Sequence, residues 1–101
     1  MTIYVDPLNA WGWKMRGREV RSCHMFTDAA DLEQLHRVAE AIGMRREWFQ
    51  NHRVAPHYDL TPGRRERAVA LGAVEVNHRT ASRIWKARRE TVIDRPIQKA
   101  G

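Results

Sequence analysis

The sequence has few of the features that mark secreted, membrane-spanning or disulfide-stabilised proteins. Cys23 is the only cysteine among 101 residues, so an internal disulfide is impossible, and this fits a reducing cytoplasm. No apolar run approaches the roughly 20 residues that a membrane-spanning helix needs. The first residues also lack the charged start and apolar segment of a signal peptide. We therefore expect a cytoplasmic protein with no membrane partner.

Most of the chain also lacks an excess of charge of either sign. The net charge is +6, but residues 78–101 alone hold 7 Lys and Arg against 2 Asp and Glu. The nearly neutral remainder argues against a broad nucleic-acid platform on the body. Hydrophobic residues make up 43% of the chain and include four Trp, enough for one small core. We therefore expect a single domain over residues 1–90, followed by a basic, frayed tail over residues 91–101.

The order of apolar stretches and turn-forming residues predicts a small layered α/β sandwich. Strands are expected at residues 2–5, 20–25, 46–50 and 73–76, and helices at 28–42, 62–71 and after 77. A long loop is expected at residues 7–21. The order is strand, loop, strand, helix, strand, helix, strand, helix. Strands that alternate with helices favour a sheet of about four mostly parallel strands, with Ile3, Tyr4, Val5, Val74 and Val76 in central strands.

The second helix has the clearest start and stop signals. Thr61 suits its N-cap, Pro62 its first position, and Gly72 the left-handed residue after its end. The free amides at its start favour an anion, and the guanidinium of Arg64 can bind phosphate oxygens in pairs. Gly63 would leave room for a close approach. These residues are candidate phosphate ligands, although a solvated basic face would give the same pattern.

Four ionisable residues are candidates for catalysis. Asp6 follows the first strand, His24 lies near the end of the second, and His57 and Asp59 precede the Thr61 helix. If these segments meet at one edge of the sheet, the two His and two Asp can transfer protons in a hydrolysis or hold a divalent metal. Their spacing matches no standard ligand signature, so no metal ligands are assigned. The alternative is a structural role, with Asp59 capping a turn and His57 making one hydrogen bond.

The long loop adds aromatic and basic residues to this candidate site. Trp13 and Arg16 mix an indole with a cation, a combination that can stack a nucleobase and contact phosphate. Tyr58, between His57 and Asp59, is a further candidate ligand contact. The alternative is that Trp13 packs as a lid over a small core.

A set of dispersed short motifs resembles a known family. The motifs are Tyr4-Val5-Asp6, Trp13, Arg16-Gly17-Arg18, Cys23-His24-Met25, Trp48-Phe49-Gln50, His57-Tyr58-Asp59 and Leu71-Gly72-Ala73-Val74-Glu75-Val76. Over about residues 2–80 the chain is similar to a family of short bacterial and phage proteins catalogued only as a domain of unknown function. The resemblance implies a compact intracellular protein, often phage-encoded. It implies no activity and no catalytic residue.

Three functions remain open on the sequence. The first is binding of a phosphate-bearing ligand, most simply a nucleotide, with hydrolysis of a phosphoester or phosphoanhydride as the natural reaction. The second is nucleic-acid binding without catalysis, through the Trp and Arg loop and the basic last helix, with contacts from Arg79, Arg83, Lys86 and Arg88. The third is a protein-interaction module, such as a phage-encoded modulator of a host protein.

Overall fold

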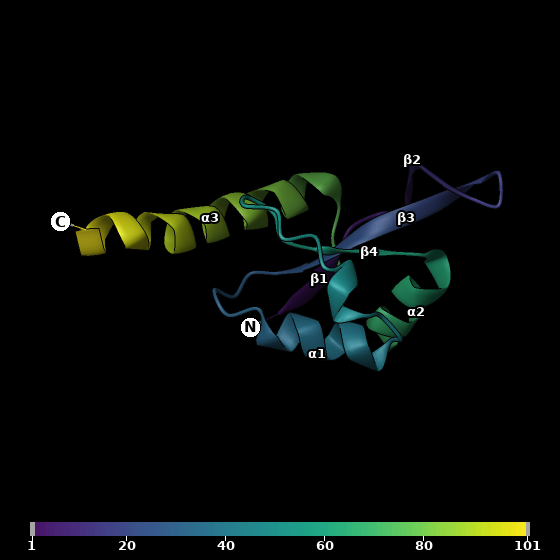
Figure 1. Ribbon diagram of the computed structural model, residues 1–101, viewed down its shortest axis with the longest axis horizontal. Helices are drawn as coiled ribbons and strands as arrows, with labels where there is room; N and C mark the ends of the chain where they lie inside the picture. The colour runs from purple at the N-terminus through teal and green to yellow at the C-terminus, as the bar shows by residue number, and fades with distance from the viewer. Residues whose placement is uncertain (1, 101) are drawn as a thin grey trace.

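The chain folds into a mixed α/β domain (Figure 1). The computed structural model describes residues 2–100, without the side chains of residues 11 and 92–100. In chain order the elements are β1 (Ile3–Val5), β2 (Asn9–Met15), β3 (Arg18–Thr27), α1 (Glu33–Ala41), the 3-10 turn η1 (Arg46–Trp48), β4 (Tyr58–Leu60), α2 (Pro62–Ala70), β5 (Val74–Glu75) and α3 (His78–Ala100). The predicted α/β class is confirmed.

The sheet is mostly antiparallel, which corrects the prediction of a mostly parallel one. Strand β3 pairs antiparallel with β1, β2 and β4, and among the strands of residues 2–100 only the β1–β5 pair is parallel. The error arose in the predicted loop at 7–21, which instead forms β2 and a two-residue hairpin turn. Arg16 and Gly17 in that turn have φ of 52° and 78°, the left-handed values that such hairpins need. Gly12, at φ 85° beside an irregular register, interrupts the alternation by which a strand is recognised.

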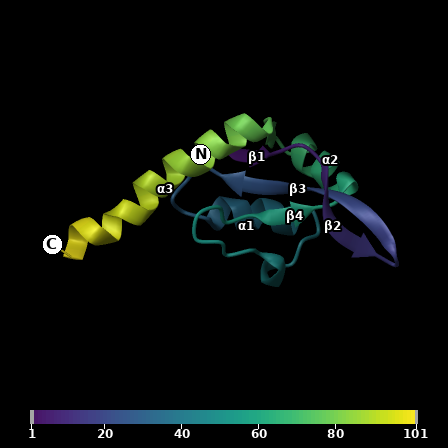
Figure 2. The same cartoon turned by 90° about the horizontal axis from the view of Figure 1, so that it is seen from above.

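The two faces of the sheet have different surroundings. Successive side chains of a strand point to opposite faces, so Cys23 and Met25 of β3 enter the core together with Tyr58 of β4. Helices α1 and α2 cover this core face, and α1 lies along β3 and β4 in both views (Figures 1 and 2). By the same alternation, His24 of β3 and Asp59 of β4 belong to the opposite face. This alternation is what gathers the polar candidates on one side.

Helix α2 follows its sequence signals closely, whereas α1 begins at Glu33, five residues after the predicted start at residue 28, because residues 28–30 form a bend. Leu35, Ala39 and Ile42 are buried along one side of α1. The hydroxyl of Thr61 accepts a hydrogen bond from the Arg64 amide at 3.5 Å and caps α2. Gly72 after α2 has φ 107°. The predicted start, cap and end of α2 are confirmed.

Helix α3 packs against the other face of the sheet. The Trp85 ring lies 4.8 Å from the Phe26 ring and 5.8 Å from the His24 ring, centroid to centroid. Arg88 donates hydrogen bonds to the carbonyl oxygens of Ala29 and Ala30, at 2.7 and 3.2 Å. The helix extends to Ala100, whereas the sequence predicted a tail from residue 91. Within residues 2–100, no helix combines the length and apolar character needed to cross a bilayer.

Two predicted strands differ in the structure. Residues 46–50 were expected to form a strand, but η1 occupies residues 46–48, so Phe49 packs against the core while Trp48 is 41% exposed. Strand β5 has only two residues and pairs with β1 alone, so Val74 is 44% exposed instead of central. Both segments are too short for a periodic pattern to fix their type or burial.

A candidate site of His and Asp on the open face of the sheet

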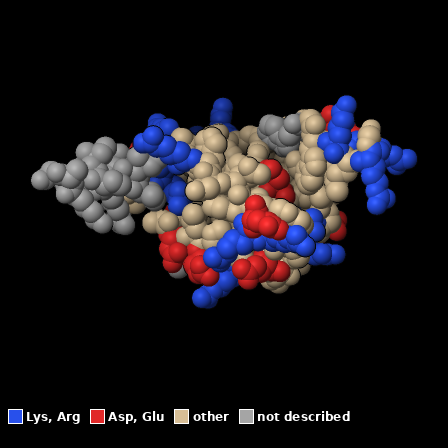
Figure 3. Space-filling model, in the orientation of Figure 1, with Lys and Arg blue, Asp and Glu red and all other residues tan. Residues whose placement is uncertain are grey.

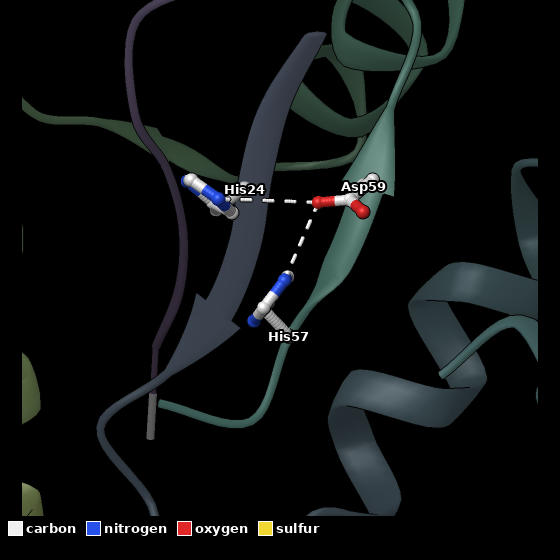
Figure 4. Close-up of side chains that lie close together, drawn as sticks. All are labelled: His24, His57 and Asp59. Carbon is white, nitrogen blue, oxygen red and sulfur yellow. Dashed lines mark ion pairs between the residues drawn. The ribbon is translucent and has the colours of Figure 1, made fainter. Parts of the chain in front are cut away.

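His24, His57 and Asp59 point toward one another from β3, from the segment before β4, and from β4 (Figure 4). Asp59 Oδ1 lies 3.3 Å from His57 Nε2 and 3.9 Å from His24 Nε2. The three atoms all lie within 4.8 Å of one another. The register that pairs His24 with Asp59 across β3 and β4 brings these side chains together.

Asp6 fixes the orientation of His24. It directly follows β1, is 1% exposed, and accepts a hydrogen bond from the His24 backbone amide through Oδ1 at 2.7 Å. Its Oδ2 lies 2.8 Å from His24 Nδ1. Because a carboxylate only accepts, Nδ1 carries the proton of this hydrogen bond. The predicted convergence of Asp6, His24, His57 and Asp59 is therefore observed, with Asp6 behind His24.

The main chain fixes the orientation of His57. Its Nδ1 lies 2.6 Å from the carbonyl oxygen of Ala55, which can only accept, so Nδ1 is again the donor. Burial lowers the pKa of His57, but the hydrogen bonds to Asp59 and to the Ala55 carbonyl, with the charges of Asp59 and Asp6, outweigh burial and raise it above 6.5. The hydrogen bond from His57 holds the pKa of Asp59 below 3.8, although burial opposes this.

Two adjoining pockets open beside the three side chains. The first has a volume of about 400 Å³ and is lined by Gly12, Trp13, Ser22, His24, Gln50, His57 and Asp59. The second, of about 530 Å³, is lined by Trp13, Met15, Met44, Glu47, Trp48, Gln50, Asp59 and Arg64. Trp13, Gln50 and Asp59 belong to both linings. The His and Asp groups therefore border a larger, more apolar space that has a cation in its wall.

Arg64 is the cation of the second pocket. Its guanidinium carbon lies 5.4 Å from the Trp48 ring centroid, and Nη2 is 3.5 Å from the Gly43 carbonyl oxygen. Its Nε is buried without a hydrogen-bond partner, and no carboxylate of the described residues lies within 4 Å of the guanidinium. The neighbouring Arg65 differs, because it donates to the Asp6 carbonyl and forms an ion pair with Glu75 at 2.8 Å. Only Arg64 of this pair remains available to an external anion.

The other predicted ligand contacts have separate positions. Trp13 lines both pockets. Thr61 caps α2, Gly63 is exposed in its first turn, and neither lines these two pockets. Arg16 is exposed in the hairpin turn between β2 and β3, also outside both linings.

Tyr58 requires a correction. We expected it to contact the ligand, but its side chain is fully buried in the core, and its hydroxyl lies 2.7 Å from His36 Nδ1. It lies between His57, just before β4, and Asp59 in the extended chain, and it therefore points to the opposite face. The sequence could not show this while residues 57–59 were read as a turn.

The basic residues of α3 fall into two groups. Arg79, Arg83 and Lys86 are exposed, and basic side chains are visible near α3 and at the hairpin end in Figure 3. Arg88 is only 7% exposed, and burial lowers its pKa. Its hydrogen bonds to main-chain carbonyls explain this position. The expectation that Arg88 contacts nucleic acid is therefore not supported by its placement.

Sequence reasoning missed several residues of the pocket walls. Ser22 lies two residues before His24 on the same strand, so the alternation of β3 could have identified it. Trp48 and Gln50 belonged to a predicted strand and to one family motif, and the sequence assigned them no role at the site. Their positions depend on η1 and on the isolated antiparallel bridge between Gln50 and His57, which no local pattern predicts.

These features define a small α/β domain with a polar site on the partly open face of a mixed sheet. The chain belongs to the family described as "Protein of unknown function (DUF4031)", whose model matches residues 3–88. The expected resemblance is confirmed, and the match extends beyond residue 80 to include Trp85 and Arg88 of α3. No curated protein matches the chain, and no solved structure does.

Proposed function

We propose that the protein binds a phosphate-bearing ligand, most simply a nucleotide, in the two adjoining pockets and hydrolyses a phosphoester or phosphoanhydride there. The observation that supports this most directly is the position of Asp59. It lines the pocket that contains Arg64 and also the pocket that contains both His rings. A phosphate held by Arg64 would therefore lie beside groups that can activate water.

The binding half of the proposal rests on Arg64 and the aromatic walls. A guanidinium without a carboxylate partner favours an anion, and phosphate offers it paired acceptor oxygens. Trp13 and the 41%-exposed Trp48 offer apolar ring surface for a base or another flat group. The pocket volumes of about 530 and 400 Å³ lie within the range of small-molecule sites.

The catalytic half rests on the oriented His and Asp side chains. Activation of water needs a group that accepts its proton, or a cation, close to the phosphorus atom. Both His rings direct Nε2 toward Asp59, so the three side chains together offer such groups. Asp6 and the Ala55 carbonyl hold these rings in place, which reduces the reorganisation needed during a reaction. Hydrolysis would then transfer the phosphoryl group to water and release the leaving oxygen with a proton.

The test pairs Arg64→Met with a matched control, Arg67→Met. Arg67 lies on the same helix, three residues later, and is exposed. In a thermal-shift assay with a panel of nucleotides and sugar phosphates, at least one ligand should raise the unfolding temperature of the native protein and of the control. Arg64→Met should bind that ligand at least about tenfold more weakly, because it loses a charged hydrogen bond. Release of phosphate should be lost in His57→Ala.

Two outcomes would contradict the proposal. One is a flat response across the panel by native protein that is folded by circular dichroism. The other is a stabilising ligand whose affinity is equal in Arg64→Met and Arg67→Met. Either result would contradict the proposed anion site. Ligand binding without release of phosphate would contradict the proposed hydrolysis.

Nucleic-acid binding is the second candidate, favoured by the exposed cations on α3 and at the hairpin turn. Arg79, Arg83 and Lys86 with Arg16 would contact phosphates, and affinity would fall steeply with salt. Replacing these residues with Gln should abolish such binding and leave nucleotide binding intact. A phage-encoded, cytoplasmic modulator of a host protein would instead use exposed apolar side chains such as Trp48 and Val74.

A further inference from the structure

The three atoms that converge at the site have the identity and spacing of a metal-ligand set. The set consists of two imidazole nitrogens and one carboxylate oxygen. His57 Nε2 lies 3.3 Å and His24 Nε2 lies 3.9 Å from Asp59 Oδ1, and all three atoms lie within 4.8 Å of one another. Around a tetrahedral ion with bonds of about 2.0–2.1 Å, neighbouring ligand atoms are separated by about 3.3 Å. The His57–Asp59 pair already has that spacing. The His24–Asp59 pair would shorten by about 0.6 Å, and the two ring nitrogens, which lie within 4.8 Å, by up to about 1.5 Å.

A second observation, outside the three side chains, points the same way. Ligating His rings usually donate their other ring N–H to a carboxylate or a backbone carbonyl, which fixes the tautomer and the direction of the ligating nitrogen. His24 has the carboxylate form of this arrangement, with Asp6 at 2.8 Å, and His57 has the carbonyl form, with Ala55 at 2.6 Å. Both rings are therefore oriented to direct Nε2 toward Asp59.

We propose that His24 Nε2, His57 Nε2 and Asp59 Oδ1 bind one divalent transition-metal ion of the Zn²⁺ type. Imidazole nitrogen suits such ions, whereas Mg²⁺ and Ca²⁺ prefer sets made wholly of oxygen. Three protein ligands leave a further coordination position, which is the pattern of a catalytic site and not of a closed structural one. Ser22 and Gln50 line the 400 Å³ pocket together with these three residues.

This inference adds a metal ion to the proposed site. The role of the ion in hydrolysis rests on the proposed function. An ion held there would use both ring nitrogens as ligands instead of proton carriers, and it would supply the activation of a bound water. The ion also offsets an electrostatic conflict, because a phosphate held by Arg64 would otherwise face the Asp59 carboxylate in the same wall. The metal-binding step itself needs no phosphate ligand, so it can be tested alone.

The first experiment is calorimetric titration of the EDTA-treated full chain with Zn²⁺ and, separately, with Mg²⁺. We expect one Zn²⁺ per chain and much weaker Mg²⁺ binding. Loss of a second-shell partner commonly weakens metal binding by about 10–100-fold, so Asp6→Asn should have an effect of that size. His57→Ala and Asp59→Asn, which remove ligands, should lose more than about 100-fold.

His78→Ala is the matched control, because His78 is an exposed imidazole at the start of α3, outside the cluster. It should bind Zn²⁺ with the affinity of the native protein. Equal Zn²⁺ affinity in His57→Ala, Asp59→Asn and native protein would overturn the metal site, as would folded native protein that does not bind Zn²⁺. Zn²⁺ binding that persists while every nucleotide fails would overturn the proposed function and leave the metal site in place.

A measurement on native protein covers the case in which a variant fails to fold. Nuclear magnetic resonance of the His ring nitrogens should show Zn²⁺ shifting the Nε2 signals of His24 and His57, with the other three rings little changed. Shifts confined to His36, His52 or His78 would overturn the proposal.

Discussion

At the scale of single residues, position in an alternating strand decides which side chains are available for chemistry. Tyr58 and Asp59 are neighbours in β4, yet the first is fully buried in the core and the second lines two pockets. In β3 the same contrast separates Cys23, whose pKa burial raises to about 12, from His24. Cys23 is therefore a packed core side chain, while His24 belongs to the polar site.

His57 makes the stability of the metal-free protein depend on pH. Its pKa is raised above 6.5 in the folded state, so its stabilising contribution is fully present below about 6.5 and is lost as pH rises through the folded value. The pKa of Asp59 is lowered, so its contribution is present above 3.8 and is lost as pH falls through the folded value. We therefore expect the free energy of unfolding of EDTA-treated protein to be highest between the folded-state pKa values of Asp59 and His57. It should fall at more acidic and at more alkaline pH.

Urea denaturation of native protein and His57→Gln across pH 5–9 measures this dependence. The loss above about pH 6.5 should be present in native protein and reduced in the variant, because glutamine does not titrate. Identical pH profiles for the two proteins would contradict the assignment of the raised pKa to His57.

At the scale of elements, the sequence predicted the features that depend on residues close together in the chain, such as helix ends. Thr61, Pro62 and Gly72 defined α2 because capping and left-handed backbone depend on residues near the helix ends. The hairpin of β2 and β3 was missed because irregular pairing around Gly12 removed its periodic signal. Which strands are neighbours depends on contacts distant in sequence, so a parallel sheet was inferred from element order alone.

A comparison of Arg88 with Arg83 tests which basic side chain of α3 holds the helix against the rest of the domain. Arg88 bonds the carbonyls of Ala29 and Ala30, so Arg88→Met should lower the free energy of unfolding by about 1.5–3 kcal/mol, the range for hydrogen bonds to charged groups. Arg83→Met, at an exposed position, should change it by less than about 0.5 kcal/mol. Chemical denaturation measures both, and equal stability of the two variants would show that Arg88 does not anchor the helix.

At the scale of the whole molecule, the sheet separates a structural face from a chemical one. Helices α1 and α2 cover one face, while α3 covers part of the other through Trp85 and leaves the His and Asp groups beside the pockets. The sequence could predict the four polar candidates because each was expected near a strand end or turn, although His24 and Asp59 lie within β3 and β4 in the structure. It could not predict their distances, since those depend on the β3–β4 register and on the main chain at Ala55.

The central claim is that the Arg64 pocket and the His and Asp cluster form one ligand site. The most direct measurement is a nuclear magnetic resonance titration of isotope-labelled full chain with a panel of nucleotides. We predict saturable shifts at Trp13, Gln50, Asp59 and Arg64, the residues that connect or line the two pockets. Shifts confined to α3 and the hairpin turn, or none with any nucleotide, would contradict it.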